Sequence, residues 1–172
     1  MKYIKDIKNK LKWEKYYDPD FDWFDWTVNT FYMGMDNDVS EDFEDFIREF
    51  KDKVDWSCIS EYKKLSEDFI REFKDKVDWE MISEFQTLSE DVIREFKDSV
   101  RWSYISESQK LTEDVSREFK NRVNWYFISH YQKLSENFIR EFKDKVWWEG
   151  IVKSQILSED FKEEFKKELS IS

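Results

Sequence analysis

The two side chains with the strongest intrinsic chemistry, one histidine and one cysteine, each occur once, as His130 and Cys58. A general base needs a nucleophile to activate and a partner to orient it, and His130 has only Ser129 and Tyr131 as chain neighbours. One cysteine cannot form an intramolecular disulfide, and without His or Cys partners it forms no zinc site. No Gly-rich phosphate loop or nucleophile elbow occurs either. The sequence therefore predicts no catalytic centre, cofactor or metal.

Carboxylates are concentrated in the segment 16–47, which contains no Lys or Arg. An EF-hand loop beginning at Asp18 would need Gly at its sixth position and Glu at its twelfth, where Trp23 and Asn29 stand. Two interpretations stay open: a solvated acidic face on a cap, or a negative surface for a basic partner such as the nucleic-acid groove of a host protein. The carboxylates of this candidate acidic patch are Asp18, Asp20, Asp22, Asp25, Asp36, Asp38, Glu41, Asp42, Glu44 and Asp45.

The overall charge excludes other partners. The chain of 172 residues has a formal net charge of −11, which repels phosphates, and its one basic segment, with six lysines up to Lys15, is short. We therefore expect no direct binding of nucleic acid. The apolar runs are too short to cross a membrane, and the first residues lack the apolar stretch of a signal peptide. We expect no membrane association and a cytoplasmic, reducing location.

A 23-residue repeat dominates the chain. Tryptophan recurs at this spacing five times, and the residues around it recur as well. Fixed-period similarity of this length is typical of stacked supersecondary units. The recurring tryptophans are Trp56, Trp79, Trp102, Trp125 and Trp148, and the copies are 42–64, 65–87, 88–110, 111–133 and 134–156, followed by a truncated copy.

One copy, 65–87, shows what each unit folds into. Its apolar residues recur every four positions, which places them on one side of a helix. Ser66 is positioned to cap this first helix, predicted over 67–76, and Asp78 to cap a second, predicted over 79–86. Helices this short are marginal alone, so their apolar sides must be covered by neighbouring copies. The predicted fold is all-α, a solenoid of stacked short helical hairpins with a 23-residue period.

The repeat also predicts how the chain is organised. Residues 1–41 do not follow the period and are interpreted as an N-terminal cap with one divergent unit. Residues 42–156 form five helical-hairpin repeats. Residues 157–172 form a C-terminal capping helix, in which Lys162 replaces the apolar residue found at that position in most other copies. A terminal unit with a polar outer side is what a solenoid requires.

Four positions of the second helix vary between copies, whereas most other positions repeat. In the first copy they are occupied by Ser57, Cys58, Glu61 and Tyr62. Positions on one helix face stack along a solenoid, so the variation forms a ridge, interpreted either as a partner-binding surface or as neutral drift. We expect residues 126 and 130 to be well exposed and 127 partly so. The candidate binding residues are Tyr104, Tyr126, Phe127, His130 and Tyr131.

The wording of the repeat, LSEDFIREFKDKVDW followed by IS-x-YQK, resembles a family of 23-residue tandem-repeat proteins of giant DNA viruses, also seen in some phage and bacterial sequences. The match covers residues 42–172. The resemblance implies a viral or mobile-element origin, a helical scaffold and a host-cytosol location. The family has no established activity, so the resemblance implies no catalytic or binding residues.

These observations predict a non-enzymatic repeat protein that binds another protein. An alternative is an acidic virus- or phage-encoded inhibitor, which would use the carboxylates of 16–47 to mimic nucleic acid and block a host nucleic-acid-binding enzyme. A third option is self-assembly into a structural layer. The sequence does not predict an oligomeric state.

Overall fold

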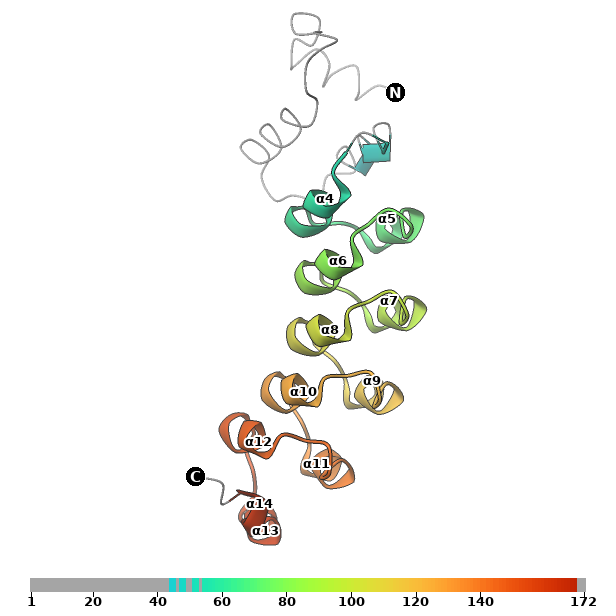
Figure 1. Ribbon diagram of the computed structural model, residues 1–172. Coiled ribbons are helices and arrows are strands. Elements are labelled where there is room, and N and C mark those ends of the chain that lie inside the picture. The colour runs from blue at the N-terminus through green and yellow to red at the C-terminus, as the bar shows by residue number, and fades with distance from the viewer. Residues whose placement is uncertain (1–43, 46, 49–50, 53, 170–172) are drawn as a thin grey trace, which may run out of the picture. The chain divides into compact units, whose positions relative to one another are not determined.

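The computed structural model describes residues 44–45, 47–48, 51–52 and 54–169 (Figure 1). The predicted N-terminal region 1–41 lies outside these residues. The chain divides into two compact units, Met1–Asp78 and Trp79–Ser172, called unit 1 and unit 2 here and described separately. Every regular element within the described ranges is helical, and no strand occurs among them.

Unit 2 is an all-α solenoid of helical hairpins that recur every 23 residues, so the predicted fold class is confirmed. The second helices pack one on the next in a single row, and α7, α9 and α11 lie beside them in a second row (Figure 1). The short α14 packs against α12 and α13 and closes the unit. The second helices are α6 (Trp79–Phe85), α8 (Trp102–Ser108), α10 (Trp125–Tyr131) and α12 (Trp148–Ser154), and the others are α7 (Glu90–Glu95), α9 (Glu113–Glu118), α11 (Glu136–Glu141), α13 (Glu159–Glu164) and α14 (Lys166–Leu169).

Unit 1 contains the same two kinds of helix in the order the repeat requires. The second helix of the first copy is α4 (Trp56–Tyr62), and the first helix of the next copy is α5 (Glu67–Glu72). Residues 44–45 and 47–48 are also helical, at the place where the repeat puts the first helix of its first copy.

The first helices begin where the sequence predicts. The hydroxyl of Ser66 accepts a hydrogen bond from the N–H of Phe69 at 3.1 Å, and the equivalent Ser or Thr does the same in every following copy. A glutamate one repeat earlier completes the cap, because its carboxylate accepts the N–H of the capping residue itself. This bond joins Glu44 to Ser66, Glu90 to Thr112, Glu113 to Ser135 and Glu136 to Ser158.

The first helices end earlier than predicted: α5 stops at Glu72, not at 76. Phe73 leaves helical geometry, and its carbonyl accepts two N–H groups in a tight turn, from Lys76 and Val77. The carbonyl of the next residue is bonded by the indole of the following tryptophan, as for Lys97 and Trp102 at 2.9 Å. The helix can stop because these carbonyls have other partners.

The second helices are not all capped by the residue before tryptophan. Asp55 and Asn124 accept N–H groups of the first turn, but Arg101 and Trp147 make no side-chain cap bond. A buried serine of the preceding copy instead accepts the N–H of this residue, as Ser83 does from Arg101 at 2.9 Å. This contact fixes the start of the helix whatever side chain stands there.

The core is the apolar side that the four-residue spacing predicts, with a tryptophan at its edge. Phe96 and Ile93 are buried, and the half-buried Trp79 packs on Phe96 with ring centroids 4.6 Å apart. The tryptophans are structural, because in most copies their indole N–H donates to a backbone carbonyl five residues earlier.

A ladder of glutamines joins the repeats of unit 2. The amide nitrogen of Gln109 donates to the carbonyls of Gln86 and Ser83, and its oxygen accepts the N–H of Leu88 at 3.0 Å. Gln132 and Gln155 make the same bonds one and two copies later. Gln109 and Gln132 are buried and Gln155 is half-buried. Each amide satisfies backbone groups of the preceding copy, so the ladder joins neighbouring copies specifically.

Candidate functional site

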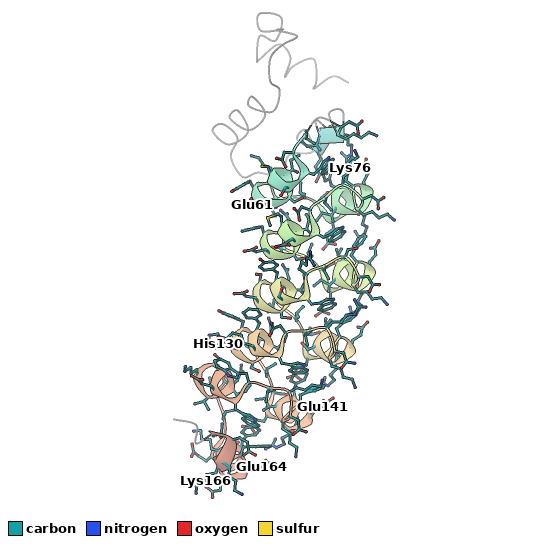
Figure 2. The ribbon with its side chains drawn as sticks, viewed as in Figure 1. Glu61, Lys76, His130, Glu141, Glu164 and Lys166 are labelled. Carbon is teal, nitrogen blue, oxygen red and sulfur yellow. The ribbon has the colours of Figure 1, made fainter. Side chains whose placement is uncertain are left out.

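The variable positions of the second helices form one surface of unit 2, called the second-helix ridge below. Every residue of this ridge is exposed or half-buried except Gly150. His130 of α10 and Glu141 of α11 mark opposite sides of the unit (Figure 2). The ridge consists of Glu80, Met81, Glu84, Phe85, Ser103, Tyr104, Glu107, Ser108, Tyr126, Phe127, His130, Tyr131, Glu149, Gly150, Lys153 and Ser154.

Large aromatic side chains are open to solvent on the ridge. Phe85, Tyr126 and Tyr131 are 49%, 46% and 53% exposed. Tyr104 and Phe127 are half-buried. The expected exposure of residue 126 and partial exposure of residue 127 are confirmed. Aromatic rings of this kind are enriched in the energetically important centres of protein interfaces.

His130 is half-buried, so it is less exposed than expected. Its ring stands edge-on to Tyr131, with centroids 4.7 Å apart, and lies 6.2 Å from the ring of Trp147. Its Nδ1 is 3.3 Å from the hydroxyl of Ser154. The neighbouring Ser129 is not available to it, because the Ser129 hydroxyl donates to the carbonyl of residue 125 and accepts the N–H of residue 147.

Trp147 is the ridge neighbour that sequence reasoning missed. Its ring packs on Tyr126 with centroids 4.4 Å apart, in the tightest aromatic contact of the α10 surface. The signal was present in the sequence, because the position before the repeat tryptophan holds Asp55, Arg101 and Asn124 in other copies. A tryptophan at a capping position makes no cap bond and has to pack elsewhere.

Carboxylates gather on the other half of the ridge, at α6 and α8. Glu84, burial, Glu80 and Glu107, in that order of importance, raise the pKa of the Tyr104 hydroxyl. Arg101 approaches Glu80 at 3.6 Å. Within the part of the chain that the structure describes, neither Glu84 nor Glu107 forms an ion pair. This half of the ridge therefore has a negative electrostatic potential.

The first-helix row of unit 2 is charged, and its arginines form ion pairs between successive copies. Arg94 contacts Glu118 one repeat later at 2.8 Å and also contacts Asp91 in its own helix. Arg117 and Arg140 repeat the arrangement with Glu141 and Glu164. The pKa of Arg94 and that of Arg117 are raised chiefly by the hydrogen bond to this glutamate. Such partly exposed pairs contribute little individually, but they place an arginine next to each of these glutamates.

The candidate acidic patch is described at two of its ten carboxylates. Glu44 is buried and accepts the N–H of Ser66 at 2.8 Å, so its carboxylate takes part in capping α5. Asp45 is paired with Arg48 at 2.8 Å. The other eight predicted members, Asp18, Asp20, Asp22, Asp25, Asp36, Asp38, Glu41 and Asp42, lie outside the described residues.

Three further observations concern Cys58, metal ligands and membrane spans. Cys58 of α4 is half-buried. Among the described residues, no three His, Cys, Asp or Glu side chains converge as metal ligands would. Within the same ranges, no helix has the length and apolarity needed to cross a bilayer. The ridge offers contact area and charge.

Comparison of this chain with protein-family models, curated proteins and solved structures finds no match. The resemblance to viral tandem repeats, which is based on the sequence of the repeat, stays a prediction.

Proposed function

We propose that this chain is a non-enzymatic helical-repeat protein that binds another protein through the second-helix ridge. One observation carries the proposal: the residues that lock the repeats together recur in copy after copy, whereas variation is concentrated on this accessible face. The Gln109 and Arg94 ladders belong to the recurring part, and Phe85, Tyr126 and Tyr131 belong to the varying part. Solenoids use extended faces of this kind for recognition.

The resemblance of the repeat supports a viral or mobile-element origin and, with it, action in the cytosol of a host cell. We keep inhibition of a host nucleic-acid-binding enzyme as the form this interaction would take if the carboxylates between 16 and 42 contribute. Neither origin nor inhibition is needed for the binding proposal, which depends on the ridge alone.

The test compares two double variants with matched chemistry. Phe85→Ser with Tyr131→Ser removes two exposed rings and installs the residue that Ser108 and Ser154 already hold at this position in other copies. Val152→Ser with Ile156→Thr is the control, because it removes two exposed apolar side chains outside the ridge and also installs residues found in other copies.

A photo-crosslinking residue at position 108 identifies proteins that touch the ridge in lysates of candidate host cells. The proposal expects crosslinks to a defined protein that are lost in the ridge variant and kept in the control. Equal crosslinking by the two variants, or the same proteins captured from position 144 in the turn after α11, would contradict it. Circular dichroism of each variant verifies that helicity is unchanged.

A further inference from the structure

The ridge of unit 2 carries unbalanced negative charge at one place. Glu149 is neutralised by Lys153, whose ammonium lies 2.5 Å from its carboxylate, and Glu80 has Arg101 at 3.6 Å. Glu84 of α6 and Glu107 of α8 have no such cation among the described residues. They occupy the same position in consecutive copies, so they lie on one face of two packed helices.

Tyr104 presents an aromatic ring near both carboxylates, because it is three residues before Glu107 on α8 and close enough to Glu84 of the packed α6 for that carboxylate to raise the pKa of its hydroxyl. The ring is half-buried, and Glu84 and Glu107 both act on its hydroxyl. A cationic side chain that approaches this ring meets two carboxylates and an aromatic group together. Cations are attracted to aromatic faces, and more strongly where water is excluded.

Exposed rings flank this charged centre on both sides. Phe85 is on α6, and Tyr126 and Tyr131 are on α10. Such rings can cover the apolar stems of Lys and Arg side chains, which place their charged ends in polar surroundings. The face thus combines two features that a basic segment needs, namely counter-charges at the centre and apolar contact at the edges.

The opposite row of unit 2 lacks this combination. Its glutamates Glu118, Glu141 and Glu164 each bind an arginine at 2.8 Å. Its largest apolar side chains, such as Phe119, are buried. A basic segment there would compete with the arginines already bound to these glutamates, and among the described residues of this row no aromatic side chain is exposed.

We propose that the second-helix ridge docks a basic segment of its protein partner, with Lys or Arg side chains placed over Tyr104 between Glu84 and Glu107. This inference depends on the proposed function and specifies the chemistry of the partner. Because the attraction is electrostatic, it governs the association rate and its dependence on salt as well as the affinity.

The experiment uses the full chain and a random peptide library displayed on phage as the probe. Enriched peptides are synthesised with a fluorescent label, and their Kd is measured by anisotropy between about 50 mM and about 300 mM NaCl. The key variant is Glu84→Gln with Glu107→Gln. Its matched control is Asp144→Asn with Glu168→Gln, which removes two exposed carboxylates outside the ridge.

The expected peptides are rich in Lys and Arg, bind more weakly as salt rises, and lose about fivefold or more in affinity with Glu84→Gln and Glu107→Gln. The control pair leaves the Kd unchanged. Neutral or acidic peptides that still depend on Phe85 and Tyr131 would overturn the inference and leave the proposed function standing. Failure to enrich any ridge-dependent peptide would also overturn the inference, whereas the proposed function is judged separately by the crosslinking of Phe85→Ser with Tyr131→Ser and by capture from position 144.

Discussion

The ring of Trp147 fills the space that a side chain at Gly150 would need. A Cβ atom built on Gly150 would lie 2.5 Å from Cε3 and 3.1 Å from Cζ3 of the Trp147 ring. Other copies hold Tyr104 or Phe127 at the position of Gly150, and Arg101 or Asn124 at that of Trp147. In this copy the large side chain therefore stands at position 147 and not at position 150, and its ring still covers the ridge.

This exchange predicts a strong coupling between the two positions. Gly150→Ala alone should destabilise unit 2 by about 1–2 kcal/mol, because the clash with the ring exceeds the gain in helix propensity. In a Trp147→Asn background the same change should be neutral or stabilising, because without the ring no clash opposes the gain in helix propensity. Urea unfolding of the four proteins of the double-mutant cycle measures the coupling. Additive effects would show that the ring moves aside without cost.

The position of a phenylalanine in the array should determine the effect of its removal. Phe119→Ala leaves a cavity beneath Trp102, whose ring centroid is 4.6 Å away, and should cost about 3–5 kcal/mol. Phe165→Ala should cost less, because the closing copy can fray while the other copies stay folded. Thermal unfolding followed by circular dichroism compares them. Equal shifts of Tm would indicate one cooperative core in place of a one-dimensional stack.

The glutamine ladder predicts a cost that the sequence pattern does not suggest. Gln109→Leu is similar in size but leaves the N–H of Leu88 and the carbonyl of Gln86 unsatisfied in the core. We expect a loss of about 2–4 kcal/mol in urea unfolding, because each unpaired buried group costs about 1–3 kcal/mol. Gln155→Leu is the control, since Gln155 makes the same bonds in a more accessible place and should cost less. An equal or smaller loss for Gln109→Leu would show that water replaces the amide.

The fold could be predicted from the sequence because five copies of the repeat show the same spacing of apolar and capping residues. The spacing of Leu65, Phe69 and Phe73 identifies the buried side, and Ser66 identifies where the helix begins. The end of the helix could not be predicted, because it depends on a bond from the indole of a residue five positions away. Polar contacts such as those of Gln109 were also missed, because the repeat shows that the glutamine recurs but not which backbone groups its amide reaches.

The ridge could be located only in part. Variation between copies correctly placed Tyr126 and Tyr131 on an accessible face. It could not reveal that Trp147 covers part of that face, because the ring reaches it from a position outside the variable set. Nor could it show that Glu84 and Glu107 lack ion pairs in the described ranges while similar glutamates of the other row have them. Pairing between copies depends on side-chain direction, which spacing alone does not determine.

Acid should weaken the C-terminal part of unit 2 through Glu136. The pKa of this carboxyl is lowered chiefly by its hydrogen bond from the N–H of Ser158, at 2.6 Å, with help from the Ser158 hydroxyl and Arg140. A lowered pKa in the folded state means that the stabilisation is complete above the ordinary carboxyl pKa and is lost as pH falls through the lowered one.

Glu136→Gln should therefore lower the Tm at pH 7, and its difference from the unchanged protein should narrow as the pH approaches about 3. Thermal unfolding across this range measures the difference, with Asp144→Asn as the control for removing one exposed carboxylate. A difference that does not change with pH would show that the ionised form of Glu136 has no special role.

Truncation of Tyr126 should have two separable effects. The sequence alone suggests a surface residue whose loss changes stability by no more than about 0.5 kcal/mol. The contact with Trp147 at 4.4 Å changes this expectation, because aromatic pairs contribute about 0.5–1.5 kcal/mol beyond the area they bury. Tyr126→Ala should thus lower the free energy of unfolding by about 1 kcal/mol, and Tyr126→Leu by less.

Binding provides the second readout. Tyr126→Phe keeps the ring and removes only the hydroxyl, so it should preserve stability and should weaken partner binding only if the hydroxyl contacts the partner. If Tyr126→Ala weakens binding more than Phe85→Ser or Tyr131→Ser does, the centre of the interface lies at the Tyr126–Trp147 pair. Equal and small losses at all three positions would instead place the binding energy on the carboxylates around Tyr104, as a basic partner segment requires.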